Sequence, residues 1–589
     1  MSREETQVLI VGGGGAGLTA SMLLSGLGVD SILVSSAPTT SDLPKAHVLN
    51  QRTVEILDDC GVIEEIRALS TPPEQMAATA WYSGLKGSHA DDGRRLARQE
   101  CFGAGYQDES WRAASAFPQM NLPQIRLEPV LRSRAEELAP GRVRFGHELT
   151  ALEQDEAGAT ATIRDHESGT DYEVGARYVI GADGGRTIPG ILGIGYEGFE
   201  ELAISYSAHI SVDLSDLAAD DDVLIRWMAA PATGDSYVVV PMGPDHWGTR
   251  SEEWVIHLIL LPNDPRAADA EGIEQQMAEA LGFDGREFEV HKLTRWVVGA
   301  VLAERFREGS VFLAGDAAHR HPPTGGLGLT SAVQDAHNLC WKLAAVLDGT
   351  AGPDLLDTYE AERRPVDARN VQRAMENAVG QLMIFNATGM SPEQDEEENR
   401  AALARLWSDD PQDAEAREAF LAGVRAQSQE FAEHNVEFGY QYEESGAILP
   451  DGSEPVSSAD DVRIHVPSTR PGSPLPHAWI DDLDGNRRPI KDLVGPGRFL
   501  LVAGEDGGPW VEAANALVAS GLPLDAVRIG HVEGDLFDAR NLWTRSRGIG
   551  RDGAVLVRPD RFVCWRSEGA ADDPAAELSE AVGAVLARP

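Results

Sequence analysis

The chain has 589 residues, of which 42% are hydrophobic and 25% are charged. These values are ordinary for a folded protein with three or four packing units, and they exclude a disordered chain. The formal net charge of −45 argues against nucleic acid or an anionic membrane surface as a partner.

A buried strand and a glycine-rich turn open the chain. Residues 8–11 are Val-Leu-Ile-Val, as in a strand covered on both faces. Residues 12–17 carry the G-x-G-x-x-G spacing and lead into a helix expected to end near Gly26. A second apolar strand is expected over 31–34. This strand–turn–helix–strand order predicts a dinucleotide site rather than a glycine-rich turn that serves only the fold.

Each glycine of this turn has a predicted task. Gly12 permits a tight turn, Gly14 lets the backbone approach a pyrophosphate, and Gly17 lets the helix pack closely on the strand. Gly15 and Ala16 begin the helix, where free N–H groups would face phosphate oxygens.

The second strand ends differently from most such units. Ser35 stands where an Asp or Glu usually binds the adenosine ribose, and it offers only a neutral hydrogen bond. A polar loop follows over 42–53, before a helix expected at 54–60. This loop suits the lining of a ligand site, although a surface loop before a capped helix explains the pattern as well.

Strands and turns dominate the next part of the chain. Residues 70–117 are rich in turn signals, and a helix is expected to reach about Leu138. We expect hairpin strands over 142–145, 148–153 and 159–164, and a strand over 172–180 that ends at Asp183.

Runs of alternating apolar and polar residues between 199 and 261 predict an antiparallel sheet, inserted as a substrate domain between two parts with glycine-rich dinucleotide signals. Aromatic and sulfur-containing side chains could line a pocket on this sheet, or could be ordinary core. The candidates are Trp227, Tyr237, Met242 and Trp296.

A second glycine-rich loop follows a buried strand at 311–313. That strand ends in Gly315-Asp316, and a Pro-Gly loop over 322–328 then feeds a helix expected at about 331–347. Backbone N–H groups and the positive end of the helix dipole suit a developing anion there. His319 and His321 have no carboxylate or cysteine cluster nearby in sequence, so we expect no metal.

The C-terminal part ends in a small α/β unit. A helix is expected over 360–383, and the acidic stretch 391–435 is interpreted as a solvated connector. After a Pro-Gly boundary the strands and helices follow a thioredoxin-like order. The four cysteines form no C-x-x-C pair, so we expect them to be reduced, as in the cytoplasm.

Three separated motifs carry a resemblance to a known family: the turn at 12–17, Asp183-Gly184, and Gly315-Asp316 within Gly-Asp-Ala-Ala-His-x-x-Pro-Pro. The chain resembles the FAD-dependent aromatic hydroxylases with the p-hydroxybenzoate hydroxylase fold. It is most similar to their phenol and 2,4-dichlorophenol monooxygenase branch, through 46–53, Asn338–Leu343 and the thioredoxin-like tail.

The resemblance implies an α/β fold with five parts. It implies a Rossmann-like FAD-binding domain with an inserted antiparallel-sheet substrate domain, and a C-terminal thioredoxin-like domain. The expected boundaries are 1–190 (FAD-binding, first part), 191–295 (substrate sheet), 296–390 (FAD-binding, second part, and long helices), 391–465 (connector) and 466–589 (C-terminal domain).

Site residues are also implied by the resemblance. The glycine turn would hold the FAD pyrophosphate, Asp316 the ribityl chain, and the loop from Pro323 the isoalloxazine. The expected cofactor-binding residues are Gly12, Gly14, Gly15, Ala16, Gly17, Ser35, Lys45, Arg52, Gln124, Asp183, Gly315, Asp316, Pro323, Gly326, Leu327, Gly328 and Leu329. In this family, arginine is usual at the two positions where this chain has Lys45 and Gly190. Asparagine is usual at the position where this chain has Thr330.

The implied chemistry is hydroxylation of a phenolic or hydroxy-heteroaromatic ring, ortho or para to its hydroxyl, by NAD(P)H, O2 and a flavin hydroperoxide. His47 is the candidate for a base or acceptor at the substrate oxygen, and bonding to cofactor or backbone is its alternative role. Baeyer–Villiger oxidation, epoxidation and a non-catalytic flavin scaffold stay open as alternatives. We expect a homo-oligomer, with no nucleic acid or membrane as partner.

Overall fold

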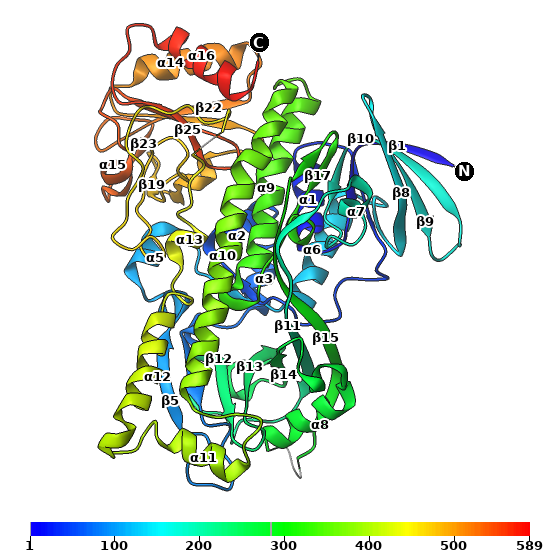
Figure 1. The fold of residues 1–589 in the computed structure, drawn as a ribbon. Coiled ribbons are helices and arrows are strands. Elements are labelled where there is room, and N and C mark those ends of the chain that lie inside the picture. Colours follow the sequence, from blue (N-terminus) through cyan, green and yellow to red (C-terminus); the bar gives the residue numbers. More distant parts are fainter. Residues whose placement is uncertain (1, 283–285, 444, 589) are drawn as a thin grey trace.

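The computed structural model describes residues 2–282, 286–443 and 445–588. In these ranges the strands form three large sheets and one short pair, and helices pack around them (Figure 1). Within the same ranges, none of the helices combines the length and low polarity that crossing a lipid bilayer requires.

The first sheet is built on the predicted apolar strand at the N-terminus. In spatial order its strands are β16 (Arg307–Glu308), β17 (Val311–Leu313), β10 (Asp171–Gly181), β1 (Arg3–Val11), β2 (Ser31–Ser35) and β7 (Val143–Phe145), with β8 (His147–Asp155) and β9 (Gly158–Asp165) as a hairpin beside β10. Strands β17, β10, β1 and β2 are parallel. The turns that follow β17, β10 and β1 therefore meet at one edge of the sheet.

Most of the strands expected in this part are confirmed, with one correction. Residues 148–153 and 159–164 form the antiparallel hairpin β8–β9. Residues 142–145 were expected to join the hairpins, but β7 pairs with β2 in parallel instead. Local patterning identified the strand but not its partner.

The second sheet contains the predicted alternating strands. Its spatial order is β18 (His319–Arg320), β15 (Glu289–Ala303), β11 (Tyr196–Ser211), β14 (Glu253–Leu260), β13 (Asp235–Gly243), β12 (Val223–Ala230), β4 (Ala78–Tyr82) and β5 (Arg95–Glu100). Strands β4 and β5 come from the stretch 70–117, which the sequence analysis left among turns. The sheet therefore draws on two separate parts of the chain.

The third sheet belongs to the C-terminal part and lies over the ends of the long helices (Figure 1). Its order is β20 (Arg487–Pro489), β19 (Trp479–Asp481), β23 (Leu536–Phe537), β22 (Leu524–Gly530), β21 (Phe499–Ala503), β24 (Ala554–Val557) and β25 (Val563–Ser567). Strands β21 and β22 are parallel, and β24–β25 is the predicted hairpin.

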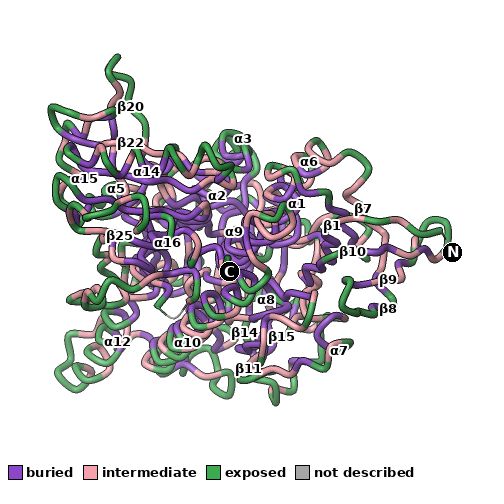
Figure 2. Tube along the Cα trace, turned by 90° about the horizontal axis from the view of Figure 1, so that it is seen from above, coloured by how far each residue is buried: buried purple, intermediate pink, exposed green. Residues whose placement is uncertain are grey.

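Two long helices run through the middle of the molecule. They are α9 (Leu327–Leu347) and α10 (Thr358–Ala387). Helix α9 begins four residues before the predicted start, directly at the second glycine loop, and most of it is buried (Figure 2). Its burial explains why its sequence is apolar on most sides.

The remaining helices cover the sheets. They are α1 (Gly15–Gly26), α2 (Gln51–Asp59), α3 (Ile63–Leu69), α4 (Phe102–Tyr106), α5 (Glu109–Ala114), α6 (Gln124–Leu138), α7 (Ile188–Leu192), α8 (Ala270–Ala280), α11 (Glu396–Ala404), α12 (Ala414–Gln427), α13 (His434–Glu437), α14 (Gly508–Ala519), α15 (Leu542–Ser546) and α16 (Pro574–Val585). The short strands β3 (Val48–Leu49) and β6 (Met120–Asn121) pair beside α2.

The stretch 391–435 is only partly the solvated connector that was expected. The start of α11 is exposed, and its Asp395 and Glu398 form a capping box. Further on, however, Phe420, Val424 and Phe431 are buried in an apolar cluster with residues of the second sheet. Because the stretch is acidic overall, its apolar stripe was not recognised in the sequence. In the structure this stripe covers the sheet.

Candidate active site

The first glycine turn is shaped by close backbone contacts. A Cβ atom on Gly12 would lie 1.9 Å from the carbonyl oxygen of Ala182, and one on Gly17 would lie 1.9 Å from the carbonyl oxygen of Gly12. A Cβ on Gly14 would meet only Oε1 of Glu128, at 3.6 Å. The protein's own packing thus requires glycine at 12 and 17, whereas at 14 it leaves the approach that a pyrophosphate needs.

The starts of α1 and α9 and the Gly315 turn converge at this edge of the first sheet. A Cβ on Gly15 would lie 2.5 Å from Leu329, and a Cβ on Gly315 would lie 3.1 Å from Ala332 and 3.2 Å from Ala16. Among the described residues, no side chain caps either helix start. Both helix N-termini therefore present free N–H groups and positive dipole ends to the same region, as an anionic dinucleotide requires.

The two acidic turns of the resemblance differ in what their carboxylates do. Asp183 accepts hydrogen bonds from the backbone N–H groups of Gly185, Thr187 and Ile188, at 3.1, 2.7 and 2.9 Å. Its carboxylate therefore holds its own turn. Asp316 is exposed, and its side chain has no hydrogen-bond partner within the described ranges. It is free to accept from the hydroxyl groups of a ribityl chain.

Gln124 fixes the loop that carries Lys45. The backbone N–H of Gln124 donates to the carbonyl oxygens of Pro44 and Ala46, at 3.0 and 2.8 Å, and its side-chain amide donates to Glu128. Lys45 is exposed and has a φ of 47°. Gln124 thus positions this loop with its backbone, and Lys45 projects from it.

Ser35 closes the end of β2 beside the turn. It is buried, and a Cβ on Gly13 would lie 3.0 Å from it and 2.7 Å from the ring of Phe145. The guanidinium of Arg132 lies 4.1 Å from the centre of that ring. Phe145 and Arg132 were not singled out from the sequence, because they come from β7 and α6, far along the chain.

The contacts of Arg52 are with α2 and with later parts of the chain. Its guanidinium pairs with Glu55 at 3.0 Å and lies over the rings of Phe438 and Phe562, at 4.2 and 5.7 Å from their centres. Phe562 belongs to the C-terminal part. The expectation that Arg52 binds the cofactor therefore finds no support in its contacts, which join α2 to other parts of the chain.

The second glycine loop follows the exposed residue Pro323 and passes close to β3. Gly325 and Gly326 have φ values of 79° and 66°, which favour glycine. A Cβ on Gly326 would lie 3.2 Å from Val48. Leu327 then begins α9. The loop thus brings bare backbone and a helix start against the residue that follows His47.

A buried carboxyl group from the supposed connector also reaches this loop. Glu430 accepts from the backbone N–H of Gly325 at 3.3 Å and from the side chains of Gln381 and Gln427. Burial raises the pKa of Glu430 to about 7, although these hydrogen bonds oppose the shift. Sequence reasoning missed Glu430, because an acidic residue in an acidic stretch carries no signal of its own.

Buried charged side chains hold the backbone of the Gly315 turn. His319 Nε2 lies 2.8 Å from Asp335, which also accepts from the backbone N–H of Gly315 at 3.0 Å. Arg363 pairs with Asp335 at 2.8 Å and with Asp367 at 3.0 Å. Burial lowers the pKa of His319, but Asp367 and Asp335 outweigh it and raise that pKa to about 9.

His319 therefore has carboxylate neighbours that its sequence surroundings did not show. His319, Asp335 and Asp367 lie close enough together to hold a metal ion. Arg363 already pairs with both carboxylates. The group is a buried salt-bridge network, in which His319 Nδ1 and Asp367 Oδ2 have no hydrogen-bond partner among the described residues.

One face of the second sheet is turned toward the second glycine loop. Its apolar side chains Val240, Met242 and Val255 share a cluster with Val48. Trp227 lies partly buried against the same cluster, where it donates to Thr79 at 3.0 Å and stacks on Trp81. Met242 and Trp227 thus occupy the face where a substrate pocket was expected.

Tyr237 lies on the opposite face of this sheet. Its side chain is fully buried in the cluster beneath α8, and its hydroxyl group bonds Thr233 and the Gln276 side chain. Because side chains alternate along a strand, Tyr237 and Met242 point to opposite faces. Tyr237 is a core residue and not a pocket residue.

Polar groups on the loop-facing side include two histidines. His47 Nδ1 lies 2.6 Å from Asn121 Oδ1. His257 Nδ1 lies 2.7 Å from Ser207 Oγ, which also accepts from Trp296 Nε1 at 2.9 Å. Burial lowers the pKa of His47 and lowers that of His257 to about 4, with a further contribution from the charge of His47.

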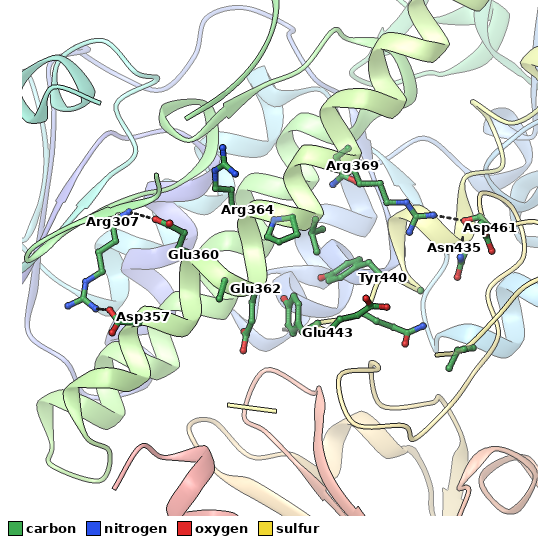
Figure 3. A pocket seen from close by; sticks show the side chains of 18 of the residues that line it. Arg307, Asp357, Glu360, Glu362, Arg364, Arg369, Asn435, Tyr440, Glu443 and Asp461 are labelled. Carbon is green, nitrogen blue, oxygen red and sulfur yellow. Dashed lines mark hydrogen bonds and ion pairs between the residues drawn. The ribbon is translucent and has the colours of Figure 1, made fainter. Parts of the chain in front are cut away.

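A cleft of about 1200 Å³ lies elsewhere (Figure 3). Its walls come from α10 and from residues 435–461, and its charges are largely paired. Arg307 pairs with Asp357, and Arg369 donates to the Asp461 carbonyl. No residue of the two glycine turns lines this cleft.

Comparisons with known proteins agree with this geometry. Residues 5–374 match the family model described as an FAD binding domain, and residues 468–589 match that described as the C-terminal domain of aromatic-ring hydroxylases. The 2,4-dichlorophenol 6-monooxygenase of Delftia acidovorans is 36% identical over 98% of this chain and 97% of its own length.

Solved structures match over the whole chain as well. The flavin-dependent monooxygenase PieE, in complex with FAD and substrate, has 38% identity and a TM-score of 0.91, and the match covers 99% of both chains. A ternary complex of aklavinone-11 hydroxylase with FAD and aklavinone has 30% identity and a TM-score of 0.78 over 100% of both chains.

Proposed function

We propose a reaction for this chain, which belongs to the family of FAD-dependent aromatic-ring hydroxylases: hydroxylation of a phenol or hydroxy-heteroaromatic, ortho or para to the hydroxyl group. The chain is an FAD-dependent monooxygenase that uses NAD(P)H and O2. Bound FAD, once reduced by NAD(P)H, activates O2 so that one oxygen atom enters the ring and the other leaves as water.

The observation that carries the proposal is the meeting of the second glycine loop with the sheet face around His47. Gly326 lies against Val48, whose apolar cluster includes Val240 and Val255. An aromatic ring bound beside this loop would pack against the apolar side chains of this face. His47 supplies a polar group beside this layer.

The chain's own residues have distinct tasks in this reaction. The N-terminus of α9 would stabilise negative charge on the flavin with backbone N–H groups, and Asp316 would bind the ribityl hydroxyls. The apolar cluster excludes water from the reacting atoms. His47 would accept a hydrogen bond from the substrate hydroxyl and so raise the electron density of the ring.

The relatives leave the size of the substrate open. One is named for a single-ring chlorophenol and another is solved with aklavinone. What these names share is a hydroxylated aromatic ring, and a phenolic hydroxyl is also what the His47 side of the site suits. We therefore propose the phenolic group, rather than the remainder of the molecule, as the recognised feature.

We also propose that the chain forms a homo-oligomer. Val379, Leu382 and Met383 of α10 are exposed, as is Leu421 of the neighbouring α12. An exposed apolar stripe of this kind fits a second copy of the same chain. Light scattering of the purified protein tests this, and a monomeric mass at micromolar concentration would refute it.

The reaction is tested with the purified FAD-containing protein and a panel of phenols and hydroxypyridines. We expect one or more of them to stimulate NADPH or NADH oxidation and to yield a product heavier by one oxygen atom. Absence of any stimulated oxidation despite bound FAD would favour a non-catalytic flavin protein.

A further inference from the structure

We propose that His47 and His257 form a clamp for a single neutral hydroxyl group, in which His47 accepts a hydrogen bond and His257 donates one. The inference rests on the proposed function, because it identifies the part of the substrate that this site recognises. It adds His257 as a substrate-contacting residue, with Ser207 and Trp296 as positioning residues.

The hydrogen bonds of His47 fix which ring nitrogen is free to accept. Asn121 presents its amide oxygen to His47 Nδ1 at 2.6 Å, while its amide nitrogen donates to Thr71 Oγ1 at 2.7 Å. An amide oxygen can only accept, so Nδ1 of His47 carries the hydrogen. In a neutral ring this leaves Nε2 as an acceptor.

The hydrogen bonds of His257 fix the opposite arrangement. An indole N–H can only donate, so Trp296 gives its hydrogen to Ser207 Oγ at 2.9 Å. The hydroxyl hydrogen of Ser207 then has one acceptor among the described residues, His257 Nδ1 at 2.7 Å. His257 therefore carries its own hydrogen on Nε2, which is a donor.

Both rings are neutral near pH 7. Burial is the main cause that lowers the pKa of each, and the charge of His47 lowers the pKa of His257 further. Both side chains nevertheless keep part of their surface accessible. Strong desolvation together with partial accessibility is expected of side chains that line an enclosed cavity.

The two rings come from different parts of the fold, and the charge of His47 acts on His257. His47 precedes Val48, which lies against Gly326 of the second glycine loop. On β14, Val255 lies two residues before His257, on the same face, and shares the apolar cluster of Val48. The clamp therefore lies beside the loop at which the flavin ring is expected.

One acceptor and one donor, without net charge, suit a particular chemical class. A phenolic hydroxyl donates to His47 and accepts from His257. A methyl ether of the same ring can only accept, and so leaves His47 without its hydrogen bond. A carboxylate would find no positive charge on either ring. We therefore expect a neutral phenol to be selected over its ether and over an aromatic acid.

The test uses the oxidised, FAD-containing protein without NAD(P)H, so that binding is read apart from turnover. The best-binding phenol of the panel and its methyl ether are titrated, and the change in flavin absorbance or the heat of binding gives each dissociation constant. We expect the phenol to bind about tenfold more tightly, the value of roughly one net hydrogen bond.

The two substitutions should have different effects. His47→Leu removes the acceptor that only the phenol uses, so it should bring the phenol-to-ether ratio close to one. His257→Leu removes the donor that both ligands use, so it should weaken the phenol and the ether alike, about tenfold, and leave the ratio unchanged. Ser207→Ala should weaken both ligands with less disturbance to packing, because it frees His257 to change its tautomer. His291→Leu, on β15 of the same sheet, is the matched control and should leave both dissociation constants unchanged. Flavin content and melting temperature report whether each variant is folded.

The outcomes separate this inference from the proposed function. If phenols are hydroxylated while, in folded protein, His47→Leu keeps the wild-type ratio or His257→Leu keeps both dissociation constants, the clamp is wrong and the hydroxylase assignment stands. If no phenol binds to the wild-type protein or stimulates NAD(P)H oxidation, both are overturned.

Discussion

His47 is the residue on which the chemistry of the substrate hydroxyl depends. Its ring accepts at Nε2 only while it is neutral, and burial lowers its pKa from the usual 6.5. Protonation therefore removes the acceptor only below that pH. We expect kcat/KM to fall on the acid side at a pH below 6.5.

Substitution of His47 tests this assignment directly. In His47→Gln the acid limb should disappear and kcat/KM should fall by roughly 10²-fold, the usual contribution of a positioned proton acceptor. The pH profile of stimulated NAD(P)H oxidation is the measurement. An unchanged acid limb in this variant would show that a different group titrates.

His319 makes the stability of the protein depend on pH in the alkaline range. Its pKa is raised to about 9 by Asp367 and Asp335 against the effect of burial. A raised native pKa means that the stabilisation is full below about 6.5 and is lost as the pH rises through 9. We expect the melting temperature to decline between pH 7.5 and 9.5.

His319→Gln should remove most of that alkaline decline. At pH 7 it should also lower the free energy of unfolding by roughly 1–3 kcal/mol, because a buried carboxylate loses a partner. Thermal unfolding across this pH range provides the measurement. A variant that keeps the wild-type slope would assign the decline to other groups.

At the scale of elements, different glycines of the turn after β1 serve packing and cofactor binding. Only Gly12 and Gly17 are required by neighbouring backbone, whereas a Cβ on Gly14 meets the protein at 3.6 Å. Gly14→Ala should therefore leave the stability of the FAD-free protein nearly unchanged. Its methyl group would nevertheless enter the space that the pyrophosphate needs, and we expect FAD affinity to fall about 10- to 100-fold.

Flavin fluorescence titration of the FAD-free protein measures this effect. Gly26→Ala is the matched control, since it lies at the other end of α1 and a Cβ there meets nothing within 4 Å. Equal FAD affinity in Gly14→Ala and wild type would contradict the placement of the pyrophosphate at this turn.

Elements with a strong local signal could be predicted from the sequence. The apolar run of β1, the start of α1 and the hairpin β24–β25 depend on neighbours in the chain, and the structure confirms them. The short strands β4 and β5 could not be predicted, because β4 pairs with β12, more than a hundred residues away, and β5 pairs with β4. The cofactor-binding and substrate residues remain predictions, apart from the placements of Arg52 and Tyr237.

Those two placements show why side-chain direction is harder to predict than strand position. Tyr237 lies on a correctly predicted strand but faces α8, because one residue of offset selects the opposite face. Arg52 was expected in the loop before a helix at 54–60, but it lies in the first turn of α2 and its guanidinium lies over the ring of Phe562 of the C-terminal part. Glu430 accepts a hydrogen bond from the glycine loop, although it belongs to a stretch whose acidic composition predicted exposure to solvent.

At the scale of the whole molecule, a buried charge cluster joins the C-terminal part to the long helices. Arg558 pairs with Glu362 of α10 and with Asp560, while Asn338 and Lys342 of α9 bind the same Glu362. This explains the polar positions in the run Asn338–Leu343, which is one of the segments that carry the resemblance to the family. They hold the interface between the two parts.

Removal of one partner should loosen that interface. Arg558→Met leaves the carboxylates of Glu362 and Asp560 buried with fewer partners, and we expect a loss of about 3–5 kcal/mol in the free energy of unfolding. Arg551→Met, which breaks an exposed pair with Asp506 in the same part, is the control and should change little. Denaturant unfolding measures the free energy of unfolding of both variants. Equal losses in the two would argue that the Arg558 cluster contributes no more than an exposed ion pair.

The central claim is that this chain inserts one atom of O2 into a hydroxylated aromatic ring. The most direct measurement is turnover of the FAD-containing protein with NAD(P)H, the best phenol of the panel and ¹⁸O2, followed by mass spectrometry of the product. The account predicts one ¹⁸O atom in a new ring hydroxyl ortho or para to the first. Hydrogen peroxide as the only product with every binding phenol, or a ring-expanded ester, would contradict it.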